Sequence, residues 1–357
     1  MWVKKLLQFT RFWYIMGLIM DSWILKGVKH LVNEPTTVNI TSPTQVKIKV
    51  THLMLTDFDE VLYNGGFDIT YPKVPGRAAV GIVMETGENC YGLEKGTRVY
   101  FEPTRPCGEC LACKSGKPKE CTSIINAGKD FDGFMRDFVV CEYNEVAPLP
   151  DSVSDFQALC IETIGIAENI YDKLNLSAGQ RVAIIGADFS GNIIAQVLQY
   201  HKVIPIIIDN NAYNLENAKR CGIHYAFAGD DDLESNMNSA TSGNLCDAAV
   251  YCATSRLPLA LATRLVSNGK TVVISCQSEI SATLSARDVL NKNLQVLGVS
   301  QAYDYTDTVI NMLVHNAVDV EHFAKEILTD YNPAALFEER SESTVKKSKM
   351  TILKMVL

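Results

Sequence analysis

The chain has 357 residues, of which 47% are hydrophobic and 21% charged. At about 100–200 residues per domain, this length predicts two globular domains, each with a core of normal size. The net charge of −8 argues against a nucleic-acid partner, and no run of Lys or Arg favours docking to acidic lipid.

Residues 1–19 form a basic and then apolar stretch that we expect to be an extension outside the fold. Its apolar run, residues 12–20, is shorter than the roughly 20 residues that a spanning helix needs. No small-residue cleavage site follows it, as a signal peptide would require. A membrane-touching segment and a packed helix remain as alternatives. Met20 is expected to open the first domain, with a first strand that closes at Gly27.

From residue 20 to about 150 the pattern is mostly strand and turn. Residues 46–50 alternate apolar and polar side chains, which is typical of a half-buried strand. Glycine and proline interrupt the sequence often, for example at Pro75 and Gly76. We therefore predict a domain resembling a β-barrel over residues 20–154.

Four of the eleven cysteines stand close together, with two, two and seven residues between them: Cys107, Cys110, Cys113 and Cys121. Four thiolates on a turn-rich loop can bind zinc tetrahedrally and leave no position for water, so we expect one structural zinc ion in a lobe at 105–122. Two disulfides and an iron–sulfur cluster are the alternatives. The odd total of cysteines is typical of a reducing compartment, and a cytoplasmic location is expected.

From about residue 155 the pattern changes to helices alternating with short apolar strands. We predict helices at 155–174, 193–200 and 215–221, and strands at 182–185, 203–208, 247–251, 271–275, 294–299 and 350–354. Such alternation predicts a parallel sheet with crossover helices, an α/β domain over 155–300. The segment 301–357 is expected to return to the first domain.

A glycine turn follows the strand at 182–185, which is the context of a dinucleotide-binding fingerprint. Gly186 would make the tight turn, and Gly191 would let the next helix pack closely. Asp209, after the next strand, would accept hydrogen bonds from the ribose and favour NAD over NADP. Asp188 replaces the middle glycine, so a domain that has kept its shape but lost its ligand is the alternative.

These segments together resemble the medium-chain dehydrogenase/reductase superfamily, in its zinc-type alcohol and polyol dehydrogenase branch. The matching segments are residues 95–99, the cysteine lobe, 133–140, 149–154 and 186–191, in the family's order. The resemblance covers residues 20–357. It implies a GroES-like catalytic domain, a Rossmann domain and a cleft between them, and in most relatives a catalytic zinc ion.

The chain departs from the family at that catalytic metal. The cysteine ligand is replaced by Thr56 and the histidine ligand by Arg77, whereas the acid Glu162 survives. Threonine and arginine do not bind zinc, so we expect no catalytic zinc. Arg77 could instead present hydrogen-bond donors to a substrate oxygen, with Thr56 as a second donor and Glu162 as a base or as a partner of Arg77. Simple mutual neutralisation of Arg77 and Glu162 is the alternative.

The sequence therefore predicts a NAD(H)-dependent oxidoreductase that acts on a small carbonyl, alcohol or activated alkene without catalytic zinc. A non-catalytic nucleotide-binding sensor or partner subunit, and a scaffold without nucleotide, are the alternatives. A homodimer or homotetramer is expected from the resemblance, and no membrane partner. The residues expected to contact the nucleotide are Gly186, Asp188, Phe189, Ser190, Gly191, Asp209, Asn210, Cys252, Ala253 and Ser275.

Overall fold

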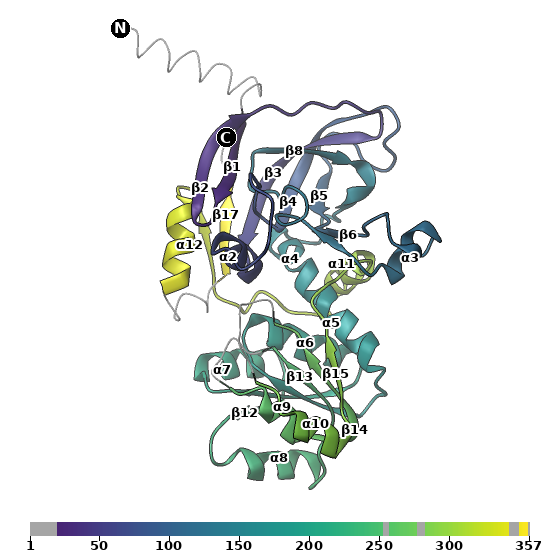
Figure 1. Cartoon of the computed structure of the whole chain (residues 1–357), viewed down its shortest axis with the longest axis vertical. Coiled ribbons are helices and arrows are strands. Elements are labelled where there is room, and N and C mark those ends of the chain that lie inside the picture. The colour runs from purple at the N-terminus through teal and green to yellow at the C-terminus, as the bar shows by residue number, and fades with distance from the viewer. Residues whose placement is uncertain (1–19, 253–256, 277–282, 343–349, 356–357) are drawn as a thin grey trace. The chain divides into compact units, whose positions relative to one another are not determined.

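The computed structural model of the chain describes residues 20–252, 257–276, 283–342 and 350–355. The chain divides into two compact units: unit 1 joins Met1–Leu159 to Lys325–Leu357, and unit 2 is Cys160–Ala324. Figure 1 shows that each unit is built around its own sheet. The expected extension at 1–19 lies outside the described residues.

Unit 1 is built on a seven-stranded sheet in the order β16-β17-β3-β4-β5-β9, with β8 also paired to β3. Its central strand, β3, buries Val46, Ile48 and Val50 completely, while the polar residues between them face outward. The strands of unit 1, including two separate two-stranded pairs, are β1 (Met20–Gly27), β2 (His30–Thr36), β3 (Gln45–Leu55), β4 (Ala78–Thr86), β5 (Arg98–Phe101), β6 (Thr104–Arg105), β7 (Ile125–Asn126), β8 (Phe138–Glu142), β9 (Val146–Pro148), β16 (Lys325–Leu328) and β17 (Met350–Lys354).

The helices of unit 1 are short and lie around this sheet: α2 (Asp57–Tyr63), α3 (Leu111–Lys114), α4 (Asp155–Leu159), α12 (Pro333–Glu342) and the 3₁₀ turns η1 (Pro118–Glu120) and η2 (Tyr143–Glu145). Helix α12, drawn in yellow in Figure 1, packs against α2. The rings of Tyr63 and Phe337 stack there with centroids 4.8 Å apart. The C-terminal segment thus supports α2, and β17 pairs antiparallel with β3.

Unit 2 holds a six-stranded parallel sheet in the order β12-β11-β10-β13-β14-β15. Its strands are β10 (Arg181–Ile185), β11 (Ile204–Asp209), β12 (Tyr225–Ala228), β13 (Cys246–Tyr251), β14 (Val266–Ile274) and β15 (Gln295–Gly298). Residues 182–185 of β10 are apolar without a break and fully buried, as expected for a strand covered on both faces. The strand order reverses between β10 and β13, where doubly wound sheets bind their ligands.

In the part of unit 2 that the structure describes, seven helices connect or cover these strands: α5 (Ile161–Leu174), α6 (Phe189–Tyr200), α7 (Ala212–Arg220), α8 (Leu233–Thr241), α9 (Ala260–Leu265), α10 (Ala286–Lys292) and α11 (Thr306–Val314). Helices α5 and α6 pack together, and α11 packs on α5. No helix among the described residues is long and apolar enough to cross a membrane.

The structure confirms the α/β class, the parallel sheet and the strand at Met350–Lys354. The single helix predicted at 155–174 is wrong, because it is interrupted at Cys160 between α4 and α5. Arg98 of unit 1 donates a hydrogen bond to Asp155 and so holds α4 in that unit. The chain passes from unit 1 to unit 2 at the break between α4 and α5. The observed units meet at residues 159/160 and 324/325, whereas the sequence analysis divided the chain at 154/155 and 300/301. Helix α11 belongs to unit 2 because it packs on α5.

Candidate functional site

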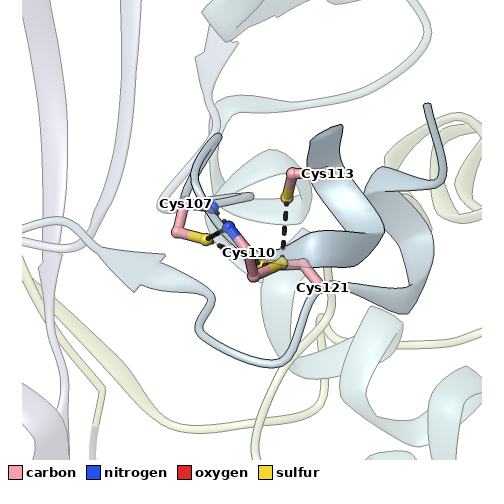
Figure 2. Close-up of side chains that lie close together, drawn as sticks. All are labelled: Cys107, Cys110, Cys113 and Cys121. Carbon is pink, nitrogen blue, oxygen red and sulfur yellow. Dashed lines mark hydrogen bonds between the residues drawn. The ribbon is translucent and has the colours of Figure 1, made fainter. Parts of the chain in front are cut away.

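The four clustered cysteines converge in unit 1, as Figure 2 shows. Cys110 caps α3 and Cys113 lies within it, while Cys107 and Cys121 come from the flanking loops. The four sulfur atoms lie within 4.8 Å of one another. The Sγ–Sγ distances are 3.5 Å from Cys110 to Cys113, 3.8 Å from Cys110 to Cys121 and 3.6 Å from Cys121 to Cys107.

These distances fit a tetrahedral metal site. Four sulfurs at about 2.3 Å from a zinc ion would lie about 3.8 Å apart, whereas a disulfide requires about 2.05 Å. Backbone N–H groups also point at the sulfurs: Cys110 donates to Cys107 Sγ at 3.3 Å and Cys107 donates to Cys121 Sγ at 3.4 Å. Backbone N–H groups, chiefly that of Cys113, lower the pKa of Cys110 to about 6. Burial raises the pKa of the neighbouring Cys113 thiol to about 12. It is the four-sulfur geometry that suits zinc, which binds cysteine as the thiolate.

The residues at the substituted metal position form a polar network inside unit 1. Thr56 caps α2, and its hydroxyl donates to Asp59 Oδ2 at 2.7 Å. Asp59 is fully buried, and its Oδ1 accepts the N–H of Gly76 at 3.0 Å. Burial raises the pKa of Asp59, while the bonds from Thr56 and Gly76 and the charge of Arg77 oppose that rise. Asp59 thus connects the start of α2 to the turn that leads into β4.

Arg77 continues this network. Its side chain is 1% exposed, its Nη1 donates to Asn126 Oδ1 at 3.0 Å, and its guanidinium lies 4.4 Å from the centre of the Phe58 ring. Asn126 in turn donates from Nδ2 to Asp130 Oδ2 at 3.2 Å. These residues do not fit a zinc ion. A guanidinium has no lone pair that a metal can bind, and the neutral Thr56 hydroxyl, bonded to Asp59, is not among the Cys, His and carboxylate ligands that zinc takes.

Sequence reasoning missed Phe58 as an aromatic partner, and it also missed Asp59 and Asn126. Asp59 had a usable signal, because Thr56 and Asp59 stand at the spacing of a helix capping box. Asn126 had none, since its contact with Arg77 spans 49 residues of chain. Glu162, the third predicted catalytic residue, lies in unit 2 in the first turn of α5 and is 6% exposed.

The nucleotide turn of unit 2 joins β10 to α6. Gly186 has a φ of +110°, a left-handed conformation that L side chains rarely adopt. A Cβ on Gly191 would lie 2.0 Å from the Gly186 carbonyl oxygen, so only glycine allows this close approach. The turn opens onto the first turn of the 12-residue helix α6, whose N–H groups have no acceptors within the helix. This geometry fits a pyrophosphate, except at Asp188.

Asp188 is the N-cap of α6, and its Oδ1 accepts the N–H of Gly191 at 3.1 Å. Phe189 and Ser190 follow in the first helical turn. The ring of Phe189 meets that of Phe323 edge-on at 5.0 Å, and Ser190 is exposed. One of the donors that would face an anion is therefore already bonded within the protein.

Asp209 ends β11 and is completely buried. Its Oδ2 accepts the N–H of Ala187 at 2.7 Å and an amide hydrogen of Asn214 at 3.2 Å, and its Oδ1 accepts the N–H of Asn211 at 2.8 Å. The carboxylate thus holds the glycine turn against β11. Asn210, which follows it, is exposed.

Of the other expected nucleotide contacts, Cys252 and Ser275 lie at the carboxyl ends of β13 and β14. The Cys252 thiol lies 3.6 Å from the Gly186 carbonyl oxygen, and the Ser275 N–H donates to the Tyr251 carbonyl at 2.8 Å. Ala253 lies outside the described residues. The glycine turn therefore contacts both Asp209, through Ala187, and Cys252, through Gly186.

Comparisons with known proteins agree with this geometry. Residues 42–151 match the family model of the alcohol dehydrogenase GroES-like domain. An uncharacterized zinc-type alcohol dehydrogenase-like protein of Haemophilus influenzae is 25% identical over 285 residues, 79% of this chain and 83% of the relative. Sorbitol dehydrogenase of Halalkalibacterium halodurans is 29% identical over 212 residues, 58% of this chain and 62% of the relative. Among solved structures, a short chain alcohol dehydrogenase of Escherichia coli CFT073, complexed with NADH, has a TM-score of 0.82 at 23% identity, covering 95% of this chain and 100% of that one.

Proposed function

Because this chain belongs to the medium-chain dehydrogenase/reductase superfamily, in its zinc-type alcohol dehydrogenase branch, we propose that it is a NAD(H)-dependent oxidoreductase that works without catalytic zinc. Membership makes the chain an oxidoreductase of dehydrogenase type. The observation that carries the cofactor assignment is the tight Gly186–Gly191 turn at the point where the strand order reverses.

Unit 2 would hold the cofactor, which when bound supplies or accepts a hydride. The first turn of α6, at Phe189 and Ser190, offers backbone donors for the pyrophosphate. The carboxylate of Asp209 disfavours a 2′-phosphate in its neighbourhood by charge repulsion, and no arginine follows it directly. These features favour NAD(H) over NADP(H).

Charge develops on the substrate oxygen or enolate during hydride transfer, and a cation must stabilise it where zinc is lacking. Arg77 supplies the positive charge at that position of unit 1. Its guanidinium lies over the Phe58 ring and donates a hydrogen bond to Asn126. A buried charge acts more strongly than one in water, because the surroundings screen it less. The proposed substrates are small carbonyls, alcohols or activated alkenes, with Thr56 and Glu162 as the other candidate catalytic residues.

One structural zinc ion per chain completes the proposal, held by Cys107, Cys110, Cys113 and Cys121. We also infer a homodimer or homotetramer. Strand β15 is one of the two edges of the parallel sheet and has a partner strand on one side only among the described residues. Sedimentation of the purified protein tests this assembly. The odd cysteine count supports a cytoplasmic location.

The test is an NADH titration, followed by turnover with a panel of aldehydes, ketones and enones, and with NAD⁺ and polyols. Binding together with turnover that survives a zinc chelator supports the proposal. Absence of any NADH binding contradicts it.

A second candidate is a nucleotide-binding protein without catalysis. It is favoured by the polar network around Asp59, which commits the Thr56 hydroxyl to the protein itself. NADH binding without turnover across the whole panel would support this candidate, and turnover of any substrate would exclude it.

A further inference from the structure

The N-terminus of α6 carries its own anion. Asp188 has extended backbone angles, φ −63° and ψ −172°, and its carboxylate lies on the first turn of the helix. Oδ1 accepts the N–H of Gly191 at 3.1 Å. The position is partly buried rather than turned into solvent. A carboxylate is a good N-cap, because it satisfies a free donor and lies favourably in the helix dipole.

The same donors and the same dipole are what a pyrophosphate would use. The backbone around Asp188 keeps the shape for that ligand, because Gly186 turns at φ +110° and Gly191 contacts the Gly186 carbonyl too closely for any side chain. Only the residue between these glycines departs from the pattern. The turn is therefore intact, with a carboxylate seated at its helix end.

The surroundings add negative rather than positive charge. Asp209 is buried beside the turn and bonded to Ala187. Cys252 lies beneath Gly186, and its thiol stays neutral because burial raises its pKa well above the ordinary value. A dinucleotide in this turn would therefore lie beside the Asp188 carboxylate, which already accepts the Gly191 N–H and would repel a phosphate.

We propose that Asp188 is the affinity-determining residue of the nucleotide turn, an internal anion with which the pyrophosphate of a dinucleotide competes. This inference rests on the proposed function, since it assumes that a dinucleotide binds at Gly186–Gly191. It has two consequences. First, the natural chain binds NADH more weakly than a chain with glycine at this position. Second, added salt weakens the repulsion between the Asp188 carboxylate and the pyrophosphate, because the Debye length falls to about 10 Å at 0.1 M.

Two substitutions separate charge from volume. Asp188→Gly removes both the carboxylate and its bulk and keeps an acceptable N-cap. Asp188→Asn keeps the size and the capping oxygen but removes the charge. We expect Asp188→Gly to lower the Kd for NADH about tenfold or more, and Asp188→Asn to give an intermediate Kd. Calorimetry and the fluorescence of NADH measure both.

Salt dependence gives a second readout. The ratio of the Kd of the natural chain to that of Asp188→Asn should shrink as ionic strength rises, since only the natural chain carries the repulsive charge. Ser285→Gly is the matched control, because Ser285 caps α10 in the same unit by bonding to the Asp288 N–H. This variant should leave the Kd unchanged.

The outcomes distinguish the inference from the function on which it rests. Tighter binding by Asp188→Gly, including the case in which only that variant binds measurably, supports the inference. Equal Kd values in all the proteins overturn the inference but leave dinucleotide binding in place. If neither the natural chain nor either Asp188 variant binds NADH while each unfolds cooperatively, both the inference and the proposed cofactor are wrong.

Discussion

Arg77 donates a hydrogen bond to Asn126 at 3.0 Å, and the two residues are 49 positions apart in the chain. This bond fixes a buried cation at the position where the family resemblance assigns a zinc ligand. Arg77 also faces Phe58, and the charge of Asp59 lies close by. A buried network of this chain's own side chains therefore occupies that position.

The first prediction concerns the stability of this network. Arg77→Met removes the guanidinium from Asn126 and takes away a positive charge that favours the ionised form of the buried Asp59. Breaking a buried charged contact typically costs about 3–5 kcal/mol. We expect a loss of about 2–4 kcal/mol in the free energy of unfolding, measured in urea, because part of the structure can relax.

Lys95→Met is the control for this variant, since Lys95 is an exposed cation in the same unit. It should change the free energy of unfolding by no more than about 0.5 kcal/mol. Equal stability of the two variants would show that Arg77 is not held by the network.

The second prediction concerns the cysteine lobe. Cys121→Ser removes one of four sulfurs, and we expect the zinc content to fall from one per chain to nearly zero, with a lower Tm. Metal content is measured by elemental analysis and Tm by calorimetry. Cys90→Ser is the matched control, because Cys90 is a free thiol outside the lobe that contacts the Gln45 carbonyl at 3.3 Å. A Cys121→Ser protein with undiminished zinc would exclude this lobe as the site.

The third prediction concerns Asp209. The N–H groups of Ala187 and Asn211 donate to the two carboxylate oxygens of Asp209. Asp209→Asn replaces one of these oxygens by an NH₂ group, so one backbone N–H would face another donor. We expect a loss of about 1–3 kcal/mol in stability and weaker NADH binding, because the glycine turn loses its support. Asp231→Asn, at an exposed position of the same unit, should change neither quantity. Unaltered stability of Asp209→Asn would contradict the bonding described here.

The fourth prediction concerns acid stability. The close approach of His52 Nδ1, 3.0 Å from Asp155 Oδ2, together with Arg98, lowers the pKa of Asp155 to about 2. A carboxyl whose pKa is lowered in the folded state stabilises the protein above its unfolded pKa, about 3.9, and loses that effect as the pH falls toward 2. We expect Asp155→Asn to cost about 1–2 kcal/mol at neutral pH and to flatten the loss of stability between about pH 4 and 2.

Urea unfolding across that pH range measures the effect. Asp151→Asn, at a nearby exposed position, serves as the control and should follow the pH dependence of the natural chain. If the free energy of unfolding of Asp155→Asn falls as steeply with acid as that of the natural chain, Asp155 does not cause the acid dependence.

The parts of the fold that depend on local pattern could be predicted from the sequence. The apolar run at 182–185, followed by glycine, predicts β10 and the turn. The alternation at 46–50 predicts the first half of β3. The strand continues to Leu55, but its last three residues are all buried and no longer alternate, so the pattern does not reveal them. Helix α2 was not predicted, because a segment of seven residues is too short to show the helical period.

The candidate sites divide in the same way. The cysteine spacing predicts a cluster because its members are close in the chain, and the structure brings the four sulfurs together. The partners of Arg77 and the three bonds of Asp209 depend on side chains that meet only after folding. Asp209 was expected to face the ribose. Asp209 is completely buried and accepts a hydrogen bond from Asn214 in the first turn of α7, a contact that no periodicity in the sequence indicates.

We propose that this chain keeps the dehydrogenase scaffold and a structural zinc ion but binds no catalytic zinc. The most direct test is the zinc content of the natural protein after dialysis against zinc, measured beside Cys121→Ser. We expect one zinc ion per natural chain and almost none in the variant. Two zinc ions per natural chain, with one retained by Cys121→Ser, would contradict it.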